Sequence, residues 1–263
     1  MMGPSTRPLA NHGGAHMCRV LLQWRGVKLY AYPTMLYLGL VAGVLGGTYA
    51  ARLHGLDSDR VYAAMLLLIL PALVGARLLF VASNWSFYRA DPTRIWRRSE
   101  GGAALYGGLV VSFLLSLPLL RALDLSVAAF WDAAAVTMLI GMVITKIGCL
   151  LNGCCGGRST EGRLGLRLPN EHGVWRRRVP TQLLEAGLAL CLLIVCLRVW
   201  DRAPFAGACI LTAVAGYGAG RWWLEAERET IDGFGSLSLH RLISAALVMV
   251  STATFALIWF SNS

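Results

Sequence analysis

Several charged residues of this 263-residue chain stand within long apolar stretches or at their ends: Arg77, Asp132, Lys146, Glu185, Arg221 and Glu225. A charge inside a membrane costs ~2.5–3.5 kcal/mol on insertion scales, so residues of this kind are functional candidates. Arg77, Lys146 and Arg221 stand at the ends of stretches, where the anionic headgroup of a lipid would lie. Arginine suits phosphate because its planar guanidinium donates two parallel hydrogen bonds. The pattern therefore favours chemistry on an anionic lipid.

Each of these charges also has an ordinary structural explanation. Asp132 or Glu185 could pair with a nearby cation and only hold helices together. Arg221 and Glu225 are four residues apart, so on a helix they share a face and could form a plain salt bridge. The sequence leaves these possibilities open.

Two glycine-rich stretches, 100–108 and 146–158, could bring backbone close to a ligand. Glycine has no Cβ, and the N–H groups that it exposes cradle anions. Small residues also occur wherever membrane helices pack closely, and such packing would account for Gly107 and Gly108. It does not explain Asn152, a polar residue flanked by glycine at the end of an apolar stretch.

The cysteines offer little by themselves. There are seven, and three of them lie inside apolar runs, where cysteine behaves as a small hydrophobic residue. Cys149, Cys154 and Cys155 have a C-x4-C-C spacing that is unusual for zinc, and no histidine lies near them in the sequence. We therefore predict no disulfide framework, no metal and no redox role.

The composition points to a membrane protein. Hydrophobic residues make up 56% of the chain and charged residues 14%, against about 25% charged residues in a typical soluble domain. The formal net charge of +10 then indicates contact with anionic lipid surfaces. Nucleic acid is excluded as a partner, because the basic residues are not interleaved with stacking aromatics.

The charged candidates must be positioned by membrane-spanning helices, each of which needs about 20 apolar residues. We predict an all-α integral membrane protein with seven spans, at residues 31–51, 61–83, 105–121, 127–150, 182–200, 204–222 and 238–260. Residues 1–29 form a polar arm ahead of the first span. They lack the layout of a signal peptide, and we place no function before about residue 24.

Seven spans put the arm and the loops 84–104, 151–181 and 223–237 on one side of the membrane. These loops carry most of the arginines outside the spans. Taken alone, the positive-inside rule would place this side in the cytoplasm.

Taken in order, the motifs resemble those of the bacterial prolipoprotein diacylglyceryl transferase family, over about residues 30–229. The matching segments are Gly75-Ala-Arg77-Leu, Asp91-Pro92 followed by Glu100-Gly-Gly, Lys146 to Arg158, Pro180-Thr-Gln-Leu-Leu-Glu185, Arg221 with Glu225, and Tyr32 at the start of the first span.

The resemblance implies transfer of the diacylglyceryl group of phosphatidylglycerol to the lipobox cysteine in the signal peptide of a prolipoprotein, with release of glycerol phosphate. No external cofactor is implied. The nucleophile is the thiol of the substrate, which must lose its proton because the thiolate is the reactive form.

The resemblance also implies an architecture. About seven transmembrane helices would enclose a lipid-accessible central cavity beneath a small extramembrane head formed by loops. Residues 30–263 would be one transferase-like domain in the bacterial inner membrane. Its motif-bearing face would lie outside the cytoplasm, against the charge rule, because several of the arginines would serve to bind phosphate.

The family's site residues carry over onto matching positions. The candidates for catalysis are Tyr106, Asn152, Arg221 and Glu225, with Tyr106 or Glu225 handling the thiol proton. The candidates for substrate binding are Arg77, Lys146, Arg158, Gly107, Gly108, Gly157 and Tyr32.

Four positions depart from the family's pattern: Tyr106 replaces histidine, Lys146 arginine, Cys149 asparagine and Cys154 glutamate. Tyrosine, with a reference pKa near ~10, is a poor base at neutral pH. Lysine keeps the charge of arginine but loses its fork. The chain is then an enzyme with another base, an enzyme with another acceptor, or a lipid-binding relative without catalysis. A small-solute transporter is disfavoured, because inverted repeats and paired broken helices are lacking.

Overall fold

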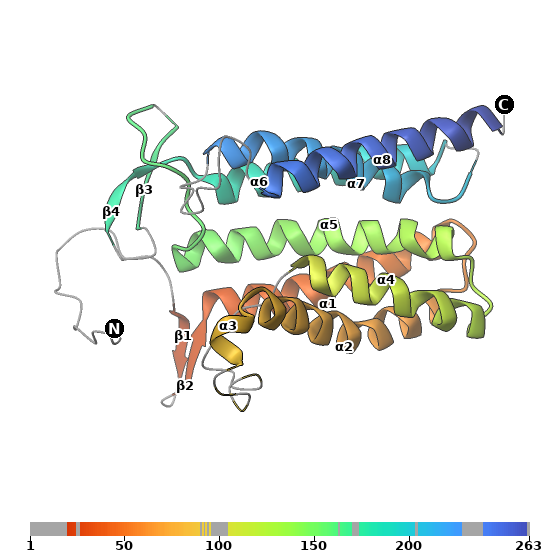
Figure 1. Ribbon diagram of the computed structural model, residues 1–263, viewed down its shortest axis with the longest axis horizontal. Helices are drawn as coiled ribbons and strands as arrows, with labels where there is room; N and C mark the ends of the chain where they lie inside the picture. Colours follow the sequence, from red (N-terminus) through yellow and green to blue (C-terminus); the bar gives the residue numbers. More distant parts are fainter. Residues whose placement is uncertain are drawn as a thin grey trace.

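The computed structural model describes residues 20–24, 27–89, 91, 93, 95, 105–162, 164–169, 174–202, 205–227 and 239–261. Within them, seven long helices run alternately in opposite directions (Figure 1). They are α1 (Ala31–Leu53), α2 (Ser58–Ser83), α4 (Leu105–Ala122), α5 (Val127–Asn152), α6 (Thr181–Trp200), α7 (Ala208–Leu224) and α8 (Leu239–Ser261). The prediction of seven spans in an all-α protein is confirmed.

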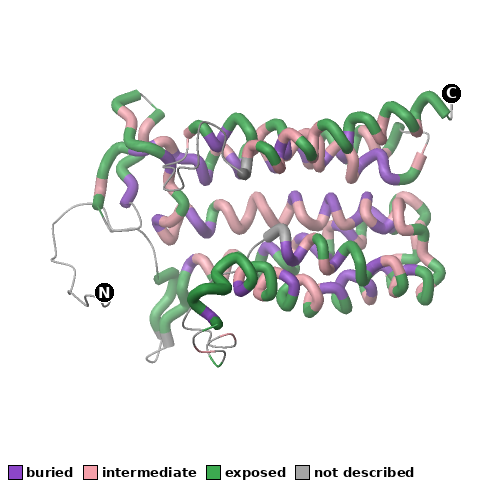
Figure 2. Tube along the Cα trace, in the orientation of Figure 1, coloured by how far each residue is buried: buried purple, intermediate pink, exposed green. Residues whose placement is uncertain are grey.

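The helices have the length and composition of membrane spans. Five of them are long and apolar enough to cross a bilayer, and a shorter apolar segment runs from Gly107 to Ala122. Many of their large apolar side chains are exposed, as expected where the solvent is lipid. Figure 2 shows exposed residues along the helices. α4 continues through Pro118. The chain is a multi-pass membrane protein.

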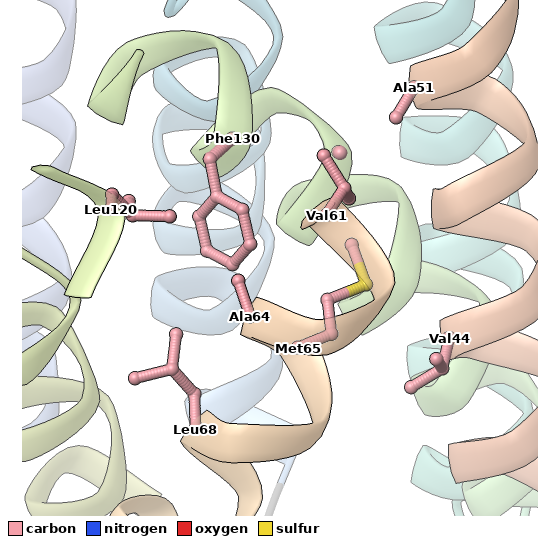
Figure 3. Close-up of a cluster of buried hydrophobic side chains, with 9 residues drawn as sticks. Val44, Ala51, Val61, Ala64, Met65, Leu68, Leu120 and Phe130 are labelled. Carbon is pink, nitrogen blue, oxygen red and sulfur yellow. The ribbon is translucent and has the colours of Figure 1, made fainter. Parts of the chain in front are cut away.

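Helix α5 is the centre of the arrangement. It packs against α1 on one side and α6 on the other, while α2 pairs with α4 and α7 with α8. One buried apolar cluster joins α1, α2, α4 and α5 around Phe130 and Leu120 (Figure 3). A second joins α1, α5, α6 and α7 through small residues such as Ala135, Ala189 and Ala213, which allow close approach of helices.

Asp132 ties α5 to the start of α7. Its carboxylate is buried and accepts hydrogen bonds from the backbone N–H groups of Gly207 (2.6 Å) and Ile210 (2.8 Å). The first N–H groups of a helix have no partner within the helix, and a carboxylate satisfies them well. Asp132 thus holds helices together, as one of the two sequence interpretations had it. Its partner is the N-terminus of a helix and not a cationic side chain.

Replacing Asp132 by alanine is expected to destabilise the protein by about 2–4 kcal/mol, because two hydrogen bonds to a charged group are lost in a buried site. Thermal unfolding of the purified protein in detergent measures this. Asp132→Asn, which keeps one acceptor oxygen, should fall between the two. An alanine variant as stable as the parent would show that this contact is unimportant.

Short elements lie at the end of the bundle where α5 and α7 finish and α6 begins, on the left in Figure 1. Strands β1 (Val20–Trp24) and β2 (Val27–Tyr30) form one antiparallel hairpin, and β3 (Leu166–Pro169) and β4 (Trp175–Arg178) form another. Helix α3 (Trp85–Tyr88) follows α2, and the 3-10 helix η3 (Glu225–Glu227) follows α7.

The first hairpin lies at the end of the predicted polar arm and at its junction with α1. Two apolar segments are separated here by Arg25-Gly26, and a two-residue connection containing glycine is a hairpin signal. That signal was available in the sequence.

Candidate functional site

Four charged side chains meet between α5, α6 and α7 at this end of the bundle. Glu185 of α6 forms ion pairs with Lys146 of α5 and, at 3.4 Å, with Nη1 of Arg221 on α7. Nη2 of Arg221 lies 3.0 Å from Oε2 of Glu225 in η3. Only 2% of the Glu185 side chain and 11% of the Arg221 side chain are exposed. We call these four residues the charged cluster.

Helical spacing explains why these residues face one another. The buried residues of α6 include Gln182, Glu185, Ala186 and Ala189, which recur three or four positions apart and so form one face of the helix. Arg221 and Glu225 are likewise four apart and pair directly. Glu185 and Arg221 therefore form the salt bridges that the sequence allowed. Their functional role stays a prediction.

A tight turn brings the chain back against the end of α5. Gly153 has φ +73°, and the N–H of Cys154 donates to the carbonyl of Cys149 at 3.1 Å. This is the pattern of a glycine-terminated helix, in which a left-handed residue satisfies the last carbonyls. The residues after Asn152 are therefore folded back toward Cys149.

The following residues connect three elements. Gly157 donates its N–H to Val179, just before α6, and Arg158 donates its N–H to Glu227 of η3. The guanidinium of Arg158 also makes two 3.1 Å contacts with the carboxylate of Glu227. A Cβ on Gly157 would lie 2.5 Å from the carbonyl oxygen of Glu227. Gly157 and Arg158 thus join this loop to the end of α7.

The start of α6 holds the same loop by its carbonyl groups. The hydroxyl of Thr181 donates to Cys155 O at 2.7 Å, and the amide of Gln182 donates to Cys154 O at 2.5 Å. Arg178, which is almost fully buried, donates to Gly157 O at 3.4 Å. These three residues were not among the predicted site residues. For Thr181 and Gln182 the available signal was a polar side chain in the first turn of an apolar span, whereas Arg178 lies in β4.

Three cysteine sulfurs converge beside the charged cluster. The Sγ atoms of Cys149, Cys154 and Cys155 all lie within 4.8 Å of one another. The side chain of Asn152 hydrogen-bonds with that of Cys154. Lys146 lies close enough to Cys155 to interact electrostatically with it. Sequence spacing alone gave no reason to expect this proximity.

Tyr32 belongs to the same end of the bundle. It stands in the first turn of α1 and interacts electrostatically with all three clustered cysteines. Together with Lys146, Asn152, Arg221 and the loop through Gly157, it makes one local group of predicted site residues.

The described contacts of Arg77 are with α2, α3 and the segment that follows them. Its Nε donates to Ile95 O at 2.9 Å, and its guanidinium lies over the rings of Phe80 and Tyr88 at 5.7 and 5.6 Å. These contacts anchor the segment after α2. A role of Arg77 in binding substrate stays a prediction. The side chain of Tyr106 lies outside the described residues.

Gly107 and Gly108 lie where α4 crosses α2. A Cβ on Gly107 would lie 2.3 Å from Gly75 O, and one on Gly108 would lie 2.8 Å from Ala72 O. Close packing of two membrane helices therefore accounts for both glycines, as the sequence allowed. Their role in binding substrate stays a prediction.

Gly107→Ala is expected to destabilise the protein by about 1–3 kcal/mol, because the added methyl group overpacks the α2–α4 contact. Gly187→Ala on α6 is the matched control, since a Cβ there would meet nothing within 4 Å. Thermal unfolding in detergent should separate the two variants. Equal stability would show that α2 and α4 do not pack so closely.

A cavity in the described part of the chain lies away from the charged cluster. It has a volume of about 360 Å³ and lies at the other end of α6, against α8. Its lining residues are Ile194, Val195, Arg198, Val199, Arg202, Phe255 and Trp259. The lipid-accessible central cavity stays a prediction.

Comparison with known proteins bears directly on this arrangement. Residues 19–259 match the family model described as prolipoprotein diacylglyceryl transferase. The chain belongs to this family. The match includes all seven long helices except the last two residues of α8, and both ends of the loop that carries the clustered cysteines.

Relatives named as enzymes of the family are distant in sequence but similar in extent. Phosphatidylglycerol–prolipoprotein diacylglyceryl transferase 2 of Clostridium perfringens is 25% identical over 230 residues, covering 85% of this chain and 89% of its own. The corresponding protein of Enterococcus faecalis is 28% identical over 242 residues, covering 86% of each chain. That of Clostridioides difficile is 26% identical over 228 residues, covering 87% and 90%.

Proposed function

We propose that the protein transfers the diacylglyceryl group of phosphatidylglycerol to the lipobox cysteine of a prolipoprotein. One observation carries the proposal: Arg221 and Lys146, two cations on different helices, share the buried carboxylate of Glu185 at the membrane end of a chain of this family. A half-buried pair of cations is suited to an anionic group that arrives from the lipid side.

The reaction needs charge neutralisation more than it needs a nucleophile from the protein. The sulfur of the acceptor cysteine bonds to the glycerol carbon of the lipid, and the bond between that carbon and the phosphate oxygen breaks. The electron pair leaves with glycerol phosphate, which gains negative charge. Preorganised donors aimed at such a developing charge lower the barrier.

Arg221 and Lys146 would supply this stabilisation. At rest their charges are balanced by Glu185 and Glu225, so the cluster carries no net charge when all four groups are ionised. A phosphate that bound here would compete with the carboxylates for the guanidinium of Arg221. Glu225 is then a candidate to receive the thiol proton, because a phosphate that took over Arg221 would release its carboxylate.

Other residues would frame the reacting groups. Asn152 stands at the end of α5 beside the turn, and Tyr32 stands at the start of α1. Arg158 is more exposed than Arg221, at 61% of its side chain, and would meet a headgroup at the surface of the membrane. The lipid itself would enter sideways between helices.

The test is reconstitution. The purified protein is given phosphatidylglycerol and a peptide with a lipobox cysteine, and the products are followed by mass spectrometry. The peptide should gain one diacylglyceryl group, and one glycerol phosphate should appear for each modified peptide. The same peptide with serine in place of cysteine should stay unmodified. Absence of both products from the folded, lipid-bound protein would contradict the proposal.

We further propose that the protein lies in the bacterial inner membrane with the charged cluster on the extracytoplasmic side. The prolipoprotein emerges from the cytoplasm on that side of the membrane, so the charged cluster would meet it there. With seven passes, Ser263 would then lie in the cytoplasm. A reporter fused there should report a cytoplasmic position, and an external position would show that the arginine distribution sets the orientation.

One observation favours a second function, phospholipid binding without turnover. Lys146 and Arg221 are already paired with carboxylates in the resting structure, so the site is neutralised before any lipid arrives. A binding protein of this kind would retain phosphatidylglycerol through purification but release no glycerol phosphate when the lipobox peptide is added.

A further inference from the structure

The three clustered cysteines are not used by the proposed reaction, whose nucleophile comes from the substrate. Their sulfurs nevertheless lie within 4.8 Å of one another, at the end of α5 and in the turn that follows it. Cys149 is buried, Cys154 is half-buried and Cys155 is exposed. The group therefore runs from the interior of the bundle to its surface.

The surrounding contacts fix this arrangement. The turn at Gly153 returns Cys154 to Cys149, while Thr181 and Gln182 hold the carbonyl groups of Cys155 and Cys154 from α6. Cys155 has φ +61°, a left-handed conformation that non-glycine residues rarely adopt and that persists only where its surroundings impose it. The three thiols are thus held by contacts from two helices.

Three converging thiols are a ligand set for a soft metal ion. Tetrahedral zinc with ~2.3 Å Zn–S bonds places its sulfur ligands about 3.8 Å apart, so small side-chain rotations would suffice here. The described residues add no fourth histidine, cysteine or carboxylate to the group. Three protein ligands with one open position are typical of catalytic and not structural zinc sites.

The neighbouring groups complement such an ion. Asn152 hydrogen-bonds with Cys154, and outer contacts of this kind orient metal ligands. Three thiolates and one Zn²⁺ together carry one negative charge. Lys146, which also pairs with Glu185, interacts electrostatically with Cys155. The site would therefore adjoin the charged cluster.

We propose that Cys149, Cys154 and Cys155 bind one Zn²⁺ and leave its fourth position for the thiol of the acceptor cysteine. The second half of this proposal rests on the proposed function. A thiol that coordinates zinc gives up its proton, which passes to water. The metal-bound sulfur then forms the bond to the glycerol carbon, and glycerol phosphate leaves with the electron pair. The oxidation state of the metal does not change.

This assignment replaces our sequence prediction of no metal, which rested on spacing along the chain. The fold brings together residues that the spacing separates. It also supplies a means of deprotonating the acceptor besides Glu225, since the other residue predicted for that task, Tyr106, is a poor base near neutral pH.

Metal content tests the first half. The full-length protein is purified in detergent under reducing conditions, exposed to zinc and desalted, and zinc is measured by mass spectrometry. The parent should retain about one zinc per chain. Cys149→Ser and Cys154→Ser should each lower the affinity roughly tenfold or more, since even outer contacts change it 10–100-fold. Cys191→Ser, an exposed cysteine of α6 outside the group, should bind as the parent does.

Cobalt provides a readout that does not depend on activity. Co²⁺ bound by the parent should show the strong absorption of sulfur-to-cobalt charge transfer, and Cys155→Ser, altered at an exposed position, should weaken it while the protein stays folded. A parent that retains no more zinc or cobalt than the triple serine variant would overturn the proposal. The proposal would also be overturned if two of the three cysteines formed a disulfide, seen as the loss of two free thiols, and no metal were bound.

The acceptor position has its own test. Adding the lipobox peptide to the cobalt-loaded protein should shift the cobalt spectrum, and the serine peptide should not. An unchanged spectrum would refute coordination of the acceptor. Metal binding without lipid transfer would instead show that the proposed function fails while the metal site stands. Full transfer by metal-free protein would show that the proposed function stands and that zinc has no part in it.

Discussion

Arg221→Ala is expected to lower the rate of diacylglyceryl transfer by roughly 10²–10³-fold or more, the usual effect of removing one donor from a preorganised anion site. Arg221 is the one residue that touches both carboxylates of the charged cluster, through Nη1 to Glu185 and Nη2 to Glu225. Its two nitrogens could instead grip two phosphate oxygens. The lipobox peptide assay, run at saturating phosphatidylglycerol, measures the loss.

Two variants sharpen this prediction. Arg221→Lys keeps the charge but loses the fork, so it should retain part of the rate. Arg198→Ala removes an exposed arginine of α6 at the opposite end of the bundle and should leave the rate unchanged. If Arg221→Ala keeps the full rate, the charged cluster is not the site.

Glu185→Gln is expected to have the largest effect on stability, because it leaves Lys146 and Arg221 without their shared buried carboxylate. Removing one partner of a buried ion pair destabilises a protein by about 3–5 kcal/mol, since the remaining charge is uncompensated. Thermal unfolding in detergent gives the change. Glu161→Gln, at an exposed position of the loop after α5, is the matched control.

A double variant separates charge balance from shape. Glu185→Gln combined with Lys146→Met removes one cation together with the anion, so the cluster again carries no net charge. Most of the lost stability should return, although transfer should stay impaired because a phosphate-binding cation is missing. A double variant as unstable as Glu185→Gln alone would show that uncompensated charge is not the cause.

The spans could be predicted from the sequence because lipid imposes a simple rule. Every backbone group must be satisfied within the helix, so each crossing appears as a long apolar stretch. The predicted ends agree with the observed ends within a few residues, as for 127–150 against Val127–Asn152. The largest difference is at the start of α7, which begins at Ala208 and not at the predicted residue 204.

What the sequence could not supply was the partner of each charge. Asp132 was predicted as a functional candidate or as one half of an ion pair, and the structure shows that it caps α7 through Gly207 and Ile210. Its role depends on how α5 and α7 meet, which no local pattern encodes. Glu185 was predicted as a functional candidate or as a counter-ion, and its position between Lys146 and Arg221 required three helices to be placed.

The cysteines illustrate the same limit more sharply. Zinc patterns are recognised by spacing, and the spacing of Cys149, Cys154 and Cys155 argued against a metal. The turn at Gly153 brings the three sulfurs close together in space, although the residues are spaced along the sequence in a way that is unusual for zinc. The polar residues that hold the turn are also distant in sequence: Thr181 lies 26 residues from Cys155 and Gln182 lies 28 residues from Cys154.

Complementation is the most direct test of the central claim that this end of the bundle is a working transferase site. The gene is expressed in a bacterial strain depleted of its own diacylglyceryl transferase, and lipidation of prolipoproteins is measured with growth. The parent chain should restore both, and Arg221→Ala, present in the membrane at equal amount, should restore neither. Failure of the membrane-inserted parent to lipidate any prolipoprotein would contradict the account.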